Sequence, residues 1–133
     1  MGIDLQALAW AVLAYLGIGT LWYSPFVFGR CWLRHAELRR NDLMAHWKAV
    51  ALSVLLATVS GFILSLLLLS LTNFTAITGG AWGALIWLGF ILPTQALEVI
   101  YYGRKIQLFL IDSGCQLLGF TAMGAILGSL LTP

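Results

Sequence analysis

Charged residues are scarce in this chain. Only 9% of its 133 residues are Asp, Glu, Lys or Arg, and 61% are hydrophobic, whereas a typical soluble domain is about 25% charged and about half apolar. The mean hydropathy is +0.95. A soluble fold of this length could not bury so much apolar surface. The composition therefore excludes an ordinary globular protein and predicts a single integral membrane domain over residues 1–133.

The common motifs of catalysis and metal binding are missing as well. The sequence contains no phosphate-binding glycine loop, nucleophile elbow, HExxH pattern or redox cysteine pair. Its two cysteines, Cys31 and Cys115, fall in a loop and in an apolar helix, so they build no disulfide framework. Cys31, His35 and His46 lack the fourth ligand of a zinc site. We therefore predict no enzymatic activity, no metal and no cofactor.

Long apolar runs are what the sequence has in abundance. A bilayer core of about 30 Å needs about 20 helical residues, and we expect helices of that length near residues 5–24, 50–71, 81–101 and 106–131. None alternates in polarity as barrel strands do. The predicted fold is all-α, a bundle of four transmembrane helices. FVFGR (26–30) is echoed by IYYGR (100–104), which fits either two parallel two-helix units or similar needs at the interface.

Basic side chains occupy only two segments. All seven Lys and Arg residues lie in the loop 29–48 or in the turn at 104–105. By the positive-inside rule, both segments are cytoplasmic and both termini lie outside. The one-sided charge suits the anionic headgroups of the lipid bilayer, and nothing further points to nucleic acid as a partner.

Acidic side chains are rarer still, and two of the five lie in EVIYYGRKIQLFLID (98–112). Glu98 and Asp112 are each seven residues from Lys105, about 10 Å along their helices. Gln95 and Gln116 lie three and four residues beyond them on the same helix faces. We expect the hairpin to stack a carboxylate layer and an amide layer at matched depths.

A charged carboxylate inside a bilayer is costly. The cost is relieved by a held proton, by a bound cation, or by a counter-ion from Arg104, Arg30 or Lys105, and the sequence leaves this choice open. The candidate ion- or proton-binding residues are Glu98, Asp112, Gln95, Gln116 and Arg104.

Glycines four residues apart mark the expected packing faces. Gly79 and Gly83 form one such pair, and Gly124 and Gly128 form another. This spacing lets helices approach closely. The contact could lie within the four-helix bundle or between copies in a homo-oligomer, and both readings stay open.

A motif after the first helix carries a family resemblance. LWYSPFVFGRCW (21–32) and YGRKIQLFLIDSGCQLLGFTAMGAILG (102–128) resemble the bacterial membrane family of domain of unknown function 1761. The resemblance covers nearly the whole chain. It implies four helices in a bacterial inner membrane, and it implies no activity. The matching interfacial motif comprises Trp22, Tyr23, Ser24, Pro25, Phe28, Gly29, Arg30 and Trp32, of which we expect Trp22 and Tyr23 to act as interfacial anchors.

Two functions follow from these patterns. The first is a small oligomeric transporter or channel-like protein, in which the carboxylate and amide layers carry protons or cations. The alternative is a non-catalytic accessory or scaffold subunit of a larger membrane complex. The expected partners are the lipid bilayer and either further copies of the chain or the subunits of that complex.

Overall fold

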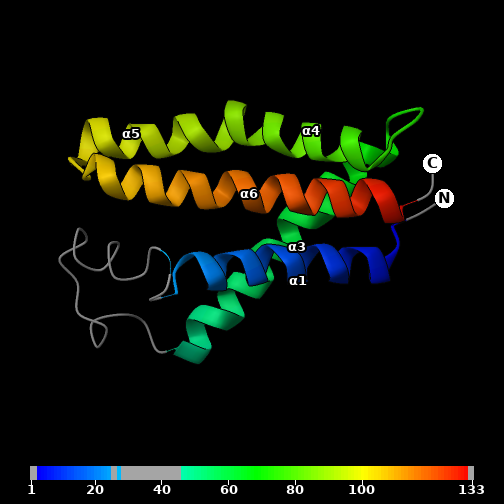
Figure 1. Cartoon of the computed structure of the whole chain (residues 1–133), viewed down its shortest axis with the longest axis horizontal. Helices are drawn as coiled ribbons and strands as arrows, with labels where there is room; N and C mark the ends of the chain where they lie inside the picture. The colour runs from blue at the N-terminus through cyan, green and yellow to red at the C-terminus, as the bar shows by residue number, and fades with distance from the viewer. Residues whose placement is uncertain (1–2, 25–26, 28–45, 132–133) are drawn as a thin grey trace.

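The described residues form four long helical spans and no strand. The computed structural model describes residues 3–24, 27 and 46–131 (Figure 1). All four spans are long and apolar enough to cross a membrane, which confirms the predicted all-α architecture. The spans are α1 (Leu5–Trp22), α3 (His46–Leu69), a third composed of α4 (Ala76–Ile86), η2 (Trp87–Ile91) and α5 (Leu92–Tyr102), and α6 (Ile106–Leu130).

Helix α6 is the centre of the bundle. Of its most apolar window, 44% is buried, against 6% for the third span. Figure 1 shows α6 between the α4–α5 span on one side and α1 on the other, while α3 crosses obliquely. Helix α1 packs against α3, and α4 packs against α6. The contact of α1 with α6 joins these two pairs of helices. The first and last described residues lie at one end of the bundle, and the α5–α6 turn lies at the other.

Two helices begin earlier than the sequence pattern indicated. The third span starts at Ala76 rather than near 81, because Thr75 caps it by accepting a hydrogen bond from the Thr78 N–H at 3.3 Å. Helix α3 starts at His46, inside the segment expected to be a loop. The remaining ends differ from the expected ones by at most two residues, within the usual uncertainty of helix ends.

Pro93 is accommodated by a change of helix type. Segment η2, just before it, is a π-helical turn in which the Leu92 N–H bonds to the Trp87 carbonyl. The Thr94 hydroxyl donates to the Phe90 carbonyl at 2.6 Å. Proline has no N–H to give to the preceding turn, so the wider turn and the threonine satisfy carbonyls that would otherwise face hydrocarbon.

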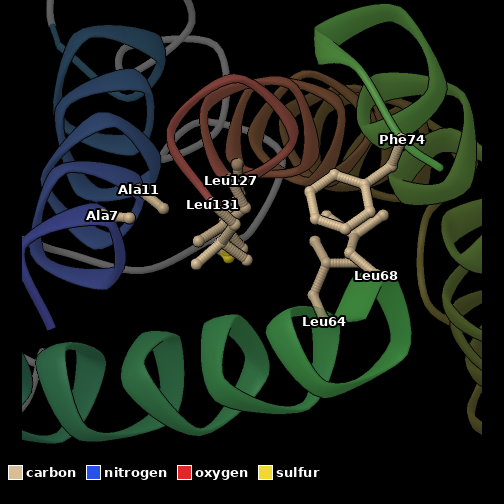
Figure 2. Close-up of a cluster of buried hydrophobic side chains, with 8 residues drawn as sticks. Ala7, Ala11, Leu64, Leu68, Phe74, Leu127 and Leu131 are labelled. Carbon is tan, nitrogen blue, oxygen red and sulfur yellow. The ribbon is translucent and has the colours of Figure 1, made fainter. Parts of the chain in front are cut away.

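The main apolar core lies near the chain ends. Figure 2 shows side chains of α1, α3 and α6 converging there, together with Phe74 from the α3–α4 connection. Leu64, Leu68 and Leu127 are at most 1% exposed. This core joins α3 to α1 and α6. The residues of the cluster are Ala7, Ala11, Leu64, Leu68, Phe74, Met123, Leu127 and Leu131.

The four glycines noted in the sequence lie in the contact of α4 with α6. A Cβ placed on Gly79 or Gly124 would lie 2.1 Å from the carbonyl oxygen of the other. A Cβ on Gly83 would lie 2.1 Å from the Phe120 oxygen, and one on Gly128 would lie 2.2 Å from the Thr75 oxygen. The two backbones therefore touch over about two turns, and the structure uses these glycines inside one chain.

Candidate functional site

The α5–α6 turn sets the geometry of the polar site. Gly103 ends α5 in the left-handed conformation, with φ 67°, which a residue with a Cβ rarely adopts. The Arg104 N–H then bonds to the Glu98 carbonyl at 3.3 Å, and α6 begins at Ile106. The chain reverses so tightly that Glu98 on α5 and Asp112 on α6 face the same residue of the turn.

That residue is Arg104, whose guanidinium bridges the two acids. Its NH1 group donates to Glu98 Oε2 at 2.6 Å, and its NH2 group donates to Asp112 Oδ2. The side chain of Glu98 is 41% exposed and that of Asp112 is 12% exposed. Of the arrangements left open by the sequence, the structure thus contains a counter-ion from Arg104, with one buried carboxylate and one accessible carboxylate.

The residue that caps the end of α1 supplies a second hydrogen-bond donor to Asp112. The Tyr23 hydroxyl donates to Asp112 Oδ1, so both oxygens of this carboxylate are hydrogen-bonded. Partial burial, followed by the hydrogen bond to Asp112, raises the pKa of Tyr23 above its ordinary value. Trp22 Nε1 donates to the Ile111 carbonyl at 2.9 Å. Trp22 and Tyr23, expected as interfacial anchors, therefore also tie the end of α1 to α6.

The rest of the interfacial motif is only partly placed. The Ser24 hydroxyl donates to the Leu21 carbonyl at 2.7 Å and so closes the end of α1. Pro25, Phe28, Gly29, Arg30 and Trp32 lie outside the described residues. Arg30 was one of the two alternative counter-ions to Arg104, so that alternative also lies outside the described residues.

A second polar group lies deeper in the bundle. The Tyr15 hydroxyl donates to Gln116 Oε1 at 2.6 Å. Gln95 and Gln116 line one cleft, as their matched depths predict, but the structure gives Gln116 a tyrosine partner rather than the other amide. Gln95 Oε1 is buried without a hydrogen-bond partner among the described residues. A buried acceptor without a donor costs about 1–3 kcal/mol, so this atom is an unusual feature.

Two clefts flank the bond between Tyr15 and Gln116, and both residues line both clefts. The Gln95 cleft has a volume of about 310 Å³ and is also lined by Ser60, Phe90, Thr94, Gln95 and Phe120, among others. The Tyr23 cleft has a volume of about 360 Å³ and is also lined by Thr20, Tyr23, Ser53 and Cys115, among others. Tyr23 connects this second cleft to Asp112.

Several of these residues were not singled out by the sequence patterns. Tyr15 and Tyr23 are eight residues apart, and Ser53 and Ser60 are seven apart, so each pair lies on one helix face. Polar residues at such spacing within apolar runs are the signal that could have found them. Trp87, which donates from Nε1 to the Ser113 carbonyl at 2.8 Å, gives no comparable signal in the sequence.

Metal ligation has little to build on here. No group of three or more His, Cys, Asp or Glu residues suited to a metal ion occurs in the described part of the chain. The arrangement instead offers a paired charge at one end of the bundle and neutral hydrogen-bonding groups further in. Chemically, carboxylates are groups that can hold a proton or a cation, and the hydroxyl and amide groups that line the clefts can form hydrogen bonds.

These features define a small multi-pass helical membrane protein with an internal polar site. The model of the family described as "Protein of unknown function (DUF1761)" matches residues 6–128. The chain therefore belongs to this family, as the resemblance in its sequence implied. No curated protein and no solved structure matches the chain.

Proposed function

We propose that the protein carries protons or small cations across the inner (plasma) membrane of a bacterium, with its basic segments in the cytoplasm and its termini outside. The observation that supports this most is the convergence of Glu98 and Asp112 on Arg104. Two carboxylates and one guanidinium sum to one formal negative charge. This net negative charge attracts a proton or a monovalent cation to the triad.

The two carboxylates have different roles in this proposal. Asp112 is held on both oxygens, by Arg104 and Tyr23, and is 12% exposed at its side chain. Glu98 is held by Arg104 and is 41% exposed. Glu98 is therefore the group that exchanges its proton or cation with the cytoplasm, and Asp112 keeps Arg104 in place.

The clefts supply the continuation of the path. The Tyr23 cleft is lined by Tyr23, whose hydroxyl donates to Asp112, and also by Thr20, Ser53 and Gln116. The Gln95 cleft begins at Gln116 and contains Ser60 and Thr94. Intramembrane polar side chains that face a cavity mark ion and proton pathways. Rotation of Tyr15 away from Gln116 would join the two clefts.

Flux into liposomes tests this proposal. The double variant Glu98→Gln with Asp112→Asn removes both charges and keeps the side-chain sizes, and its proton and sodium flux should fall to that of empty liposomes. Asp4→Asn is a matched control, because Asp4 caps α1 and Asn caps equally well. Flux in the double variant equal to that of wild type would refute the proposal.

An accessory or scaffold role is the second candidate. The third span is only 6% buried, and its exposed apolar side chains include Ile77, Leu88 and Phe90, at 85%, 54% and 72% exposure. This face can contact lipid, another copy of the chain or a larger complex. Native mass spectrometry after gentle extraction separates these cases: a homo-oligomer fits the transport proposal, and a stoichiometric complex with unrelated subunits fits the accessory role.

A further inference from the structure

The Gln95 cleft contains an acceptor that the described protein leaves unused. Gln95 Oε1 is buried and has no hydrogen-bond donor there, although it lines a space of about 310 Å³. Every other buried side-chain nitrogen or oxygen in the described residues has a partner. A molecule that fills the cleft and directs an O–H at Gln95 Oε1 would give this acceptor the hydrogen-bond donor it lacks.

The walls of this cleft are suited to a planar ring. Tyr15 and Phe120 meet edge to face, with ring centroids 5.9 Å apart and planes at 83°, and Phe90 contributes a third ring. Aromatic walls favour an aromatic guest through offset and edge contacts. Ligand pockets of about 300–1,000 Å³ with a few polar groups among apolar ones are typical of small-molecule sites, and this cleft lies at the lower end of that range.

We expect the cleft to open towards lipid, because its lining residue Phe90 lies in the middle of the third span. Phe90 at its edge is 72% exposed, and it lies in the middle of a span predicted to cross the bilayer. Helix α3, which contributes Ser60, diverges from α5 towards the end of the bundle where α3 begins (Figure 1). A ligand with an apolar tail can therefore enter sideways from the membrane.

We propose that the Gln95 cleft binds a neutral lipophilic phenol or hydroquinone, whose ring lies among Tyr15, Phe90 and Phe120 and whose hydroxyl donates to Gln95. A phenol in this cleft would occupy part of the proposed ion path, but its binding needs neither Glu98 nor Asp112. The failure of this inference and the failure of the transport proposal are distinguishable for the same reason.

The test uses two probes that differ by one hydroxyl group. Binding of radiolabelled 4-dodecylphenol and of dodecylbenzene is measured on the full chain reconstituted in lipid nanodiscs, with empty nanodiscs as background. The phenol should bind saturably and about tenfold more tightly than the hydrocarbon, since a buried acceptor gains its missing donor. No saturable binding, or equal affinity for the two probes, overturns the proposal, and this comparison needs no variant to fold.

Two amide variants then locate the site. Gln95→Leu should make the affinities for the phenol and the hydrocarbon equal, because it replaces the amide acceptor with an apolar side chain of similar size. Gln107→Leu is the matched control, since Gln107 lies exposed near the start of α6, and it should keep the tenfold preference. A preference that persists in Gln95→Leu would place the phenol elsewhere and overturn the assignment.

Discussion

Replacing Gly124 by alanine tests the backbone contact between α4 and α6. The new Cβ would lie 2.1 Å from the Gly79 oxygen and 2.8 Å from its carbonyl carbon. Contacts of a Cβ below 3.0 Å essentially do not occur, so the helices would have to separate by about 0.9 Å. Neither partner is a side chain that can rotate away. We expect a loss of about 3 kcal/mol in the free energy of unfolding, at the upper end of overpacking costs.

A second glycine provides a control of opposite sign. A Cβ on Gly17, within α1, meets nothing within 4 Å. Gly17→Ala should therefore stabilise the protein by about 0.5–1 kcal/mol, because alanine restricts the unfolded chain and favours helix. Both variants are measured by equilibrium unfolding in mixed micelles with increasing SDS, followed by tryptophan fluorescence. Equal stability of Gly124→Ala and Gly17→Ala would show that the close contact does not exist.

The polar network yields further predictions in the same unfolding assay. Tyr23→Phe removes only the hydroxyl that donates to Asp112 and should cost about 1 kcal/mol, whereas Tyr102→Phe, at a side chain 84% exposed, should have no effect; equal effects would contradict the hydrogen bond. Arg104→Gln should cost about 1–3 kcal/mol, because it leaves Asp112 without its guanidinium. Glu98→Gln should cost less than about 1 kcal/mol, since Glu98 is 41% exposed. In the double variant Arg104→Gln with Asp112→Asn, the loss should be smaller than the sum of the two single losses, and strict additivity would argue against the ion pair.

The sequence by itself determined the number of spans and the class of protein. Apolar runs of about 20 residues have one stable state in lipid, a helix whose backbone satisfies its own hydrogen bonds. The glycine spacing and the equal distances of Glu98 and Asp112 from the turn are also local properties, readable from helix geometry. The linear order of residues is therefore enough to locate the close-packing faces and the carboxylate layer.

Tertiary structure decided which groups meet. Arg104 forms ion pairs with both acids because Gly103 reverses the chain within three residues. Tyr15 and Tyr23 reach α6 only because α1 packs against it, and no spacing within α1 reveals that neighbour. The position of α3 is likewise set by tertiary packing, because Leu64 and Leu68 pack against residues of α1 and α6. In a bilayer, apolar faces do not select their neighbours by hydrophobicity. Close packing and hydrogen bonds between distant segments select them, and a linear pattern does not record these.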